Sequence, residues 1–300
     1  GRFISDLPDL PRKEEELVKA RAEISESRLA GEDMVVAYGD HTVLSGIDFK
    51  VLEGELTVIL GPNACGKSTL LKALARVNPL KGGKVFLDGL PLSKMKSRSI
   101  AQILAMLPQT PEAPTGLTVA DVVARGRYPH QSLLRSWSEK DEAACVEAME
   151  AANVLELADR PIEALSGGQR QRVWIAMTLA QQTPLILLDE PTTYLDITHQ
   201  IEVLNLTKKL HSEGHTVAVV LHDLNLAFRY ATHAVLMKEG RIIAQGDPRA
   251  IITPELIQEV FDLQSVIIPD PCTGTPLVIP KENQTIHIAA DAISAARESE

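Results

Sequence analysis

The sequence predicts an α/β fold in which a parallel sheet carries an inserted helical segment. The apolar run Leu56 to Leu60 enters a glycine-rich turn, and Lys67 to Val77 then has the apolar spacing of a helix. Strand signals return later and alternate with helical patterns at His199 to Ser212 and Leu224 to Ala231. These later strand signals are Leu185 to Leu188, Val217 to Leu221 and Ala234 to Met237. Strands that alternate with helices are typical of a parallel sheet.

The chain before the first predicted strand is rich in charged residues. Pro8 and Pro11 precede a stretch of Glu, Lys, Arg and Ala that runs through Arg28. We expect residues 1–32 to form a charged extension, either a solvated helix or a partly disordered segment, with a specific regulatory arm as the alternative. The runs Met34 to Tyr38 and Ile47 to Leu52 have strand character. The folded domain is therefore predicted to span residues 33–280.

The middle of the chain is predicted to be helical. After Gly89 no strand signal comparable to the others interrupts the pattern before the run that begins at Leu185. Three helical patterns occupy this part: Asp121 to Arg125, Glu139 to Ala152 and Gln169 to Gln182. We place an inserted helical subdomain at about residues 110–183.

The C-terminal part is punctuated by proline. Five prolines lie between residues 248 and 280, and this stretch is expected to pack on the edge of the sheet. Residues 281–300 are predicted to form a polar, loosely ordered tail.

Composition limits the classes of partner. The formal net charge of −10 disfavours non-specific binding to nucleic acid, because a polyanion is repelled. The apolar runs are far shorter than the roughly 20 residues needed to cross a bilayer. We expect no secretory signal near the start, and reduced thiols, since the three cysteines lack CxxC spacing. Contact with a membrane is therefore expected to go through another protein.

A phosphate-binding loop is the strongest local signal. The nine residues that follow the run Leu56 to Leu60 and lead into the next helix fit G-x-x-x-x-G-K-[ST] followed by Thr. This motif needs a strand before it and a helix after it. They are Gly61, Pro62, Asn63, Ala64, Cys65, Gly66, Lys67, Ser68 and Thr69. Backbone N–H groups bind phosphate oxygens, Lys67 adds positive charge, and the Ser68 hydroxyl can ligate Mg²⁺. Cys65 is interpreted as a packing residue, with a redox role as the alternative.

Two carboxylates follow the apolar run at Leu185 to Leu188. Asp189 is expected to hold Mg²⁺ through its water shell, and Glu190 to polarise the water that attacks the γ-phosphorus. Together with the phosphate loop, this pair predicts a nucleotide hydrolase.

A third motif narrows the class. It comprises Leu165, Ser166, Gly167, Gly168 and Gln169, and it stands just before a predicted helix. Ser166 can cap that helix, and the glycines let backbone N–H groups approach a phosphate closely. With this motif the sequence resembles the ATP-binding subunits of ABC transporters. The resemblance implies a P-loop NTPase with a RecA-like parallel sheet core, an antiparallel β subdomain and an inserted helical subdomain. It also implies ATP, Mg²⁺, and two copies that face each other head to tail.

Four further residues match positions of that family. The resemblance implies that Tyr38 stacks on adenine, with a core aromatic as the alternative, and that Gln109 reaches Mg²⁺ and the attacking water, with an exposed loop glutamine as the alternative. It implies that Asp196 lies in a loop crossing the dimer interface. His222 is implied to hold the γ-phosphate and orient Glu190, where a buried structural histidine would be the default.

Longer segments resemble one branch of the family, the importers of iron siderophores and vitamin B12. These segments are Ala124 to Gln131, Thr192 to Gln200, Leu221 to Tyr230 and Asp270 to Pro280, and the last two are most similar to ferric enterobactin importers. The implied function is the ATP-hydrolysing motor for import of a catecholate-type ferric siderophore. Haem or cobalamin import is the alternative cargo, and a soluble ABC ATPase acting on DNA ends or the ribosome is the alternative class.

The resemblance also implies partners and a location. We expect a transmembrane permease at the cytoplasmic face of the membrane, with a substrate-binding protein acting indirectly and no nucleic acid. The expected permease contacts are Arg125, Arg127, Tyr128 and His130. Ala64 departs from the family, which usually carries Gly there, so the local backbone has less freedom.

Overall fold

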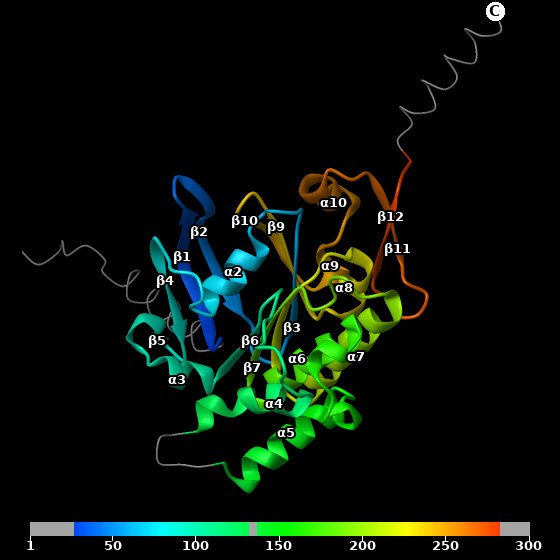
Figure 1. The fold of residues 1–300 in the computed structure, drawn as a ribbon. Coiled ribbons are helices and arrows are strands. Elements are labelled where there is room, and N and C mark those ends of the chain that lie inside the picture. Colours follow the sequence, from blue (N-terminus) through cyan, green and yellow to red (C-terminus); the bar gives the residue numbers. More distant parts are fainter. Residues whose placement is uncertain (1–26, 132–136, 283–300) are drawn as a thin grey trace, which may run out of the picture.

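A six-stranded sheet forms the centre of the computed structural model, which describes residues 27–131 and 137–282 (Figure 1). The strand order is β10-β9-β3-β8-β7-β6, and every neighbouring pair except β10 with β9 is parallel. The strands are β3 (Leu56–Leu60), β6 (Leu104–Leu107), β7 (Leu185–Asp189), β8 (Thr216–Val220), β9 (His233–Lys238) and β10 (Arg241–Gly246). The predicted α/β class with a parallel core is confirmed.

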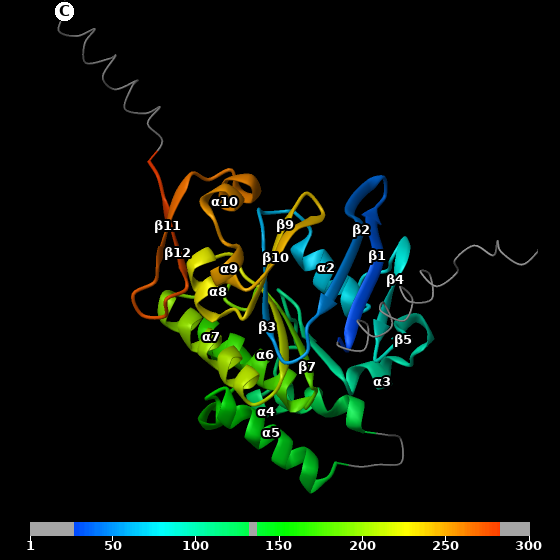
Figure 2. The same cartoon turned by 180° about the vertical axis from the view of Figure 1, so that it is seen from behind.

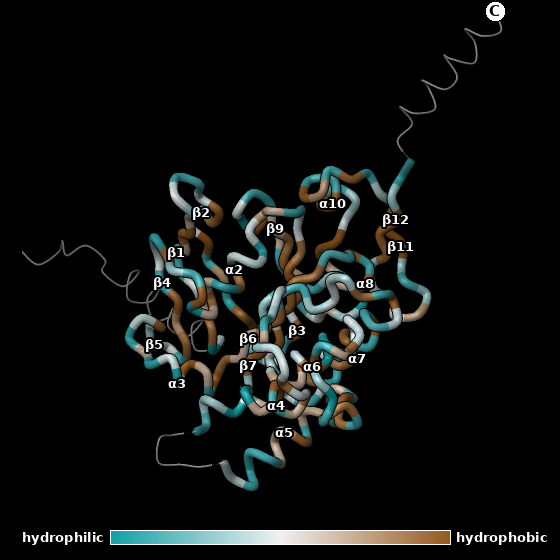
Figure 3. Tube along the Cα trace, viewed as in Figure 1, coloured by the Kyte–Doolittle hydropathy of each residue, from teal (hydrophilic) through white to brown (hydrophobic). Residues whose placement is uncertain are grey.

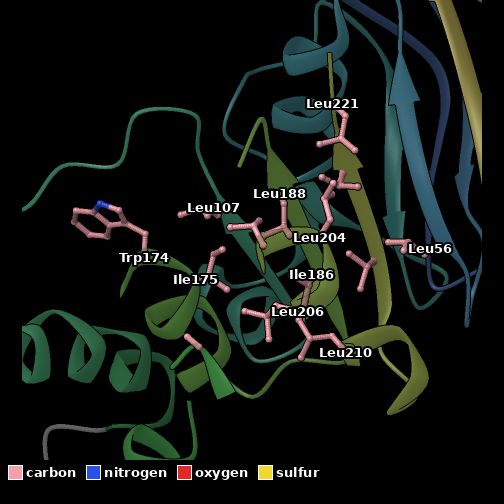
Figure 4. Close-up of a cluster of buried hydrophobic side chains, with 14 of the residues drawn as sticks. Leu56, Leu107, Trp174, Ile175, Ile186, Leu188, Leu204, Leu206, Leu210 and Leu221 are labelled. Atoms are coloured by element: carbon pink, nitrogen blue, oxygen red, sulfur yellow. The ribbon is translucent and has the colours of Figure 1, made fainter. Parts of the chain in front are cut away.

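The central strands are buried on both faces, which explains their continuous apolar sequence. In β7 the side chains alternate between two hydrophobic clusters. Ile186 and Leu188 pack on the cluster that includes Leu204 and Leu210 of α7 (Ile197–Ser212) (Figure 4). Leu185 and Leu187 join the cluster on the other face, under α2 (Lys67–Leu74). The sheet is thereby clamped between helices, and its carboxyl ends are left to build a site.

A second, antiparallel sheet lies beside α2, with strand order β2-β1-β4-β5 (Figures 1 and 2). Its strands are β1 (Leu29–Tyr38), β2 (His41–Val51), β4 (Gly82–Leu87) and β5 (Leu90–Pro91). Leu29 is fully buried in the same cluster as α2, so the folded part begins before residue 33. Residues 1–26 of the predicted extension lie outside the described residues.

The helical part is formed by α4 (Val119–Ala124), α5 (Glu139–Ala151) and α6 (Gly167–Ala180), together with the 3-10 segment Arg125–His130. All three helices begin with reciprocal caps, in which Thr118, Ser138 and Ser166 accept from the backbone of the residue three positions later and that residue's side chain bonds back. These caps fix where each helix starts, which sets the position of Ser166 and the glycines after it. The subdomain limits of 110 and 183 stay a prediction.

One expectation about the chain's organisation is wrong. The strand β6 lies after Gly89 and pairs in parallel with β7, although no strand was expected there. It has four residues, and so short an apolar run is hard to distinguish from buried helix by its sequence.

The proline-rich end packs at the edge of the central sheet that β10 and β9 form, as predicted. It forms α9 (Pro248–Ile251), α10 (Pro254–Phe261) and the hairpin of β11 (Ser265–Pro269) and β12 (Pro276–Pro280). The hairpin is held to α8 (Leu224–Tyr230), where Asn225 bonds the Val278 backbone in both directions and Arg229 pairs with Asp270 at 2.6 Å.

Hydrophobic residues concentrate along the strands and the inner sides of the helices, while loops and outer turns are hydrophilic (Figure 3). Among residues 27–131 and 137–282, no helix has both the length and the apolar character needed to cross a bilayer.

Candidate active site

The phosphate loop connects β3 to α2, as its motif requires. Residues from Asn63 to Thr69 line a cavity of about 300 Å³ together with His41, Val43, Glu190 and His222. The Lys67 side chain is buried, and its Nζ donates to the carbonyl oxygens of Gly61 at 2.8 Å and Pro62 at 2.9 Å. A buried ammonium that meets only neutral carbonyls is a good partner for an anion, which the cavity has room to admit.

Close packing under the loop explains two small residues. A Cβ on Gly61 would lie 2.6 Å from the Cys65 sulfur and 2.4 Å from the Met237 carbonyl oxygen. The Cys65 thiol is buried, and this burial raises its pKa, although Lys67 opposes the shift. A thiol with a raised pKa is poorly nucleophilic, which supports the packing interpretation of Cys65 over a redox role.

Asp189 at the end of β7 offers an unsatisfied carboxylate to the site. Its Oδ1 accepts a 2.6 Å hydrogen bond from the Ser68 hydroxyl, whereas no described residue bonds its buried Oδ2. Burial raises the pKa of Asp189, because nothing compensates its charge fully. An oxygen donor pair of this kind, with one orphaned carboxylate oxygen, fits a hard cation such as Mg²⁺.

Glu190 is held from three sides. Its Oε2 accepts hydrogen bonds from Gln109 Nε2 and from Thr193 Oγ1 at 3.2 Å, and His222 Nε2 lies 2.8 Å from the same oxygen as a charge partner. The carboxylate is buried and the imidazole is partly exposed. The structure thus brings together three residues predicted from far apart in the sequence and adds Thr193, which was not predicted.

The predicted adenine-stacking residue lies at the edge of this site. Tyr38 ends β1, is 54% exposed, and accepts a 2.7 Å hydrogen bond from Asn78. Tyr38 pairs with His41 across the tip of the β1–β2 hairpin. His41 and Val43, and not Tyr38, line the phosphate cavity. The core alternative for Tyr38 does not fit this exposure. His41 and Val43 were missed, because only the strand pairing brings them to the loop.

The third motif lies away from the cavity. Ser166 caps α6, with its hydroxyl 3.2 Å from the Gln169 nitrogen, and Gly167 opens the helix with no other described atom within 4 Å of where its Cβ would be. Asp196 caps α7 by accepting from the His199 nitrogen at 3.0 Å. No residue of Leu165 to Gln169, nor Asp196, lines the phosphate cavity of its own chain. The predicted site therefore falls into two separate groups.

One expected permease contact is wrong. Arg127 is 4% exposed, and its guanidinium bonds Asp141 at 3.0 Å, the Ala180 carbonyl at 2.7 Å and Gln182 at 3.0 Å. It is a buried structural residue. Tyr128 is 62% exposed and Arg125 is half-buried, so both stay available; His130 bonds the Gln181 carbonyl at 2.7 Å.

The site is that of a P-loop ATPase. It combines a strand, a phosphate loop and a helix with the Asp189 carboxylate beside Ser68 and with the Glu190 carboxylate, which its neighbours hold in place. The comparisons narrow this class. The family model described as "ABC transporter" matches residues 44–193. The chain is 50% identical over 255 residues to a probable siderophore transport system ATP-binding protein, YusV of Bacillus subtilis, covering 85% of this chain and 93% of the relative. It is 49% identical over 257 residues to the ferric enterobactin transport ATP-binding protein FepC of Escherichia coli, covering 85% and 95%.

Solved structures agree with this family. A metal-chelate type ABC transporter in an inward-facing conformation matches with a TM-score of 0.73 and 28% identity, over 87% of this chain and 99% of that one. The dimeric bacterial ABC transporter cassette MJ0796 matches with a TM-score of 0.65 and 27% identity, over 72% and 97%. This chain belongs to the ABC transporter family, as an ATP-binding ATPase of that family.

Proposed function

We propose that this chain is the ATP-hydrolysing subunit of an ABC importer that energises uptake of a ferric siderophore of the catecholate type. The observation that carries the ATPase part is the Glu190 carboxylate, fixed beside the phosphate loop by two hydrogen bonds and by its pair with His222. The cargo is supported by the names of the relatives. Those at 45–50% identity are named for siderophores, enterobactin, petrobactin, achromobactin and ferric hydroxamate, while the hemin import relatives are 40–44% identical.

The phosphate loop binds the triphosphate of ATP in this proposal. Lys67 has one Nζ proton left after its two carbonyl bonds, and it directs that proton to the β- and γ-phosphates. Ser68 and Asp189, with Gln109 nearby, are the residues that would hold Mg²⁺, and the ion would supply positive charge to the phosphates there.

Glu190 positions the attacking water. Gln109, Thr193 and His222 all contact Oε2, so the other carboxylate oxygen, Oε1, is the one proposed to accept a hydrogen bond from water. Gln109 and His222 fix the plane of the carboxylate, and His222, being partly exposed to the cavity, also contacts the γ-phosphate. The protein's task is to place water in line with the leaving oxygen.

The motor acts as a pair. A second copy supplies the motif from Leu165 to Gln169 to the ATP of this chain, which agrees with its separation from the phosphate cavity. Closure and reopening of the pair drive a transmembrane permease at the cytoplasmic face of the membrane, and a substrate-binding protein delivers the cargo to that permease. Tyr128 and Arg125 belong to the surface proposed to meet the permease.

Uptake of radiolabelled iron tests the proposal. Cells that depend on this chain receive either the intact protein, Glu190→Gln, or the matched control Glu150→Gln, which lies on the exposed side of α5. Uptake of a ferric catecholate should collapse with Glu190→Gln and stay normal with Glu150→Gln. If uptake of ferric hydroxamate, haem or cobalamin is lost instead, the proposed cargo is wrong but the role as a transport ATPase stands. If uptake of every substrate stays normal, the transport function is refuted.

A further inference from the structure

We propose that His199 is a positioning residue that fixes Gly168 of the 165–169 motif against the loop carrying Asp196. The inference rests on the proposed function, in which both segments meet the nucleotide of the partner subunit. His199 lies outside the phosphate cavity, yet it would determine how the 165–169 motif is positioned toward the ATP that the partner subunit holds.

The two glycines of the motif have different surroundings. Gly167 is exposed and has open space where a Cβ would be, which suits a close approach by a phosphate from outside. Gly168 is buried, and a Cβ there would lie 2.8 Å from both Cγ and Cδ2 of His199 and 3.2 Å from its Nδ1. The imidazole ring therefore packs closely against the backbone of Gly168, at the start of α6. Position 168 therefore needs a glycine because a side chain there would meet the His199 ring of the same chain, apart from any need of a ligand.

The same ring binds the second segment. His199 Nδ1 lies 2.7 Å from Asp196 Oδ1, and the carboxylate accepts the Nδ1 proton in this pair. The backbone nitrogen of His199 donates to the same oxygen at 3.0 Å, as the cap of α7. These bonds, the backbone one first, hold the pKa of Asp196 below its usual range. One histidine thus contacts the motif through its ring carbons and the dimer loop through its ring nitrogen.

Few other polar contacts tie these helix starts together. Arg172 of α6 approaches Glu202 of α7 at 3.5 Å, one turn farther from the motif. Without the ring, the buried face of Gly168 would lose its packing, and the Asp196 carboxylate would keep only its bonds to the backbone of Thr198 and of residue 199. The phosphate cavity, which contains none of these residues, should not change.

Two substitutions separate the two contacts. His199→Asn keeps a donor near the Nδ1 position but removes the ring, and His199→Phe keeps a ring but removes the donor. In a Glu190→Gln background, each variant should bind ATP as a monomer within about twofold of the parent, while the ATP concentration for half-maximal dimerisation rises about tenfold. Light scattering coupled to size exclusion measures the dimer, and a fluorescent ATP analogue measures monomer binding and confirms folding.

A double-substitution cycle gives the decisive result. Gly168→Ala should displace the ring and weaken dimerisation, whereas Gly168→Ala with His199→Ala should be no weaker than His199→Ala alone, since the clash is gone. His211→Asn, at the far end of α7, is the matched control and should dimerise like the parent. Parent-like dimerisation of the His199 variants, or fully additive losses in the cycle, would overturn the inference. If the Glu190→Gln parent itself fails to dimerise with ATP, the proposed function fails, and this inference falls with it.

Discussion

At the scale of single residues, Ala64 is a strained position inside the phosphate loop. Its φ is 60°, in the left-handed region, where a Cβ meets the following carbonyl oxygen. The neighbouring loop residue Gly66 has a φ of 105°, which only glycine adopts readily. The loop therefore keeps its phosphate-binding shape at Ala64 at some cost in stability.

Ala64→Gly should raise the free energy of unfolding by about 1 kcal/mol, because relief of the left-handed strain exceeds the extra entropy that glycine gives the unfolded chain. Affinity for ATP should stay within about threefold, since the loop already has its binding shape. Urea unfolding and ATP titration measure the two quantities. The control Asn63→Gly, at a position without positive φ, should leave stability unchanged or lower it; a gain there equal to that of Ala64→Gly would contradict the explanation.

Which site residues could be predicted from the sequence depends on how local their signals are. Lys67 and Ser68 belong to one continuous motif, and Asp189 and Glu190 directly follow the apolar residues of one strand. Their roles can therefore be predicted from short stretches of sequence, without knowledge of the tertiary structure. Thr193 contacts Glu190 by a bond that follows from the left-handed turn at Glu190 itself, with φ of 50°. His41 and Val43 reach the cavity only through strand pairing, which the sequence does not specify.

At the scale of elements, the C-terminal end of α6 joins the surface proposed for the permease to the helix that begins with the 165–169 motif. Arg127 and His130 bond the carbonyls of Ala180 and Gln181, which lack partners inside the helix. Gly126 packs on the carbonyl of Met177, where a Cβ would lie 2.1 Å away. The segment Arg125–His130 and α6 are therefore expected to move together.

Arg127→Met should lower the free energy of unfolding by about 3 kcal/mol, because it leaves the buried Asp141 without its cationic partner. Adding Asp141→Asn to Arg127→Met should recover part of this loss, since an amide can keep the caps to Ser138 without a buried charge. Urea unfolding measures each variant. Arg125→Met, two residues away and half-buried, is the control and should change stability by less than about 0.5 kcal/mol.

The loss caused by Arg127→Met should depend on pH. The Ser138 hydroxyl first, and Arg127 after it, hold the pKa of Asp141 below its usual range against the effect of burial. The carboxylate therefore stabilises the fold fully above about pH 4, and this contribution is lost as pH falls through the folded pKa. In Arg127→Met the carboxyl gains its proton at higher pH, which relieves the buried charge. The stability difference from the intact protein should shrink from pH 7 toward pH 4, and a constant difference would show that the ion pair is not its cause.

The elements missed by sequence reasoning share a physical property. The four-residue strand β6 and the edge strand β10 (Arg241–Gly246) have weak signals of their own, and pairing with the buried strands β7 and β9 stabilises them. Helix starts were clearer, because capping residues such as Ser138 and Ser166 mark them locally. Arg127 was assigned to the surface since nothing near it in sequence reveals Asp141 as a buried partner.

At the scale of the whole molecule, one chain carries two half sites that cannot meet each other. The phosphate cavity contains Lys67 and Glu190, while Gly167 opens a separate helix with free space before it. A symmetric pair brings each half site of one copy to the opposite half of the other, so that two complete sites form. The active unit of the proposed motor is therefore the pair.

Mixing two inactive variants tests this composite site. Lys67→Ala removes the cation of the phosphate cavity, and Gly167→Asp puts a carboxylate where the partner's γ-phosphate would approach, although Asp is tolerated at the start of a helix. Each variant alone should lack ATPase activity. In an equal mixture half of the dimers are mixed, and each of those has one intact site, so about one quarter of the intact protein's rate should return if a single site can work. Steady-state phosphate release measures the rate. Mixtures that form mixed dimers yet stay inactive would show either that the two sites must act together or that the two halves do not combine into one site. Occlusion of ATP in the mixed dimer separates these two cases, because occlusion requires the combined site but no hydrolysis.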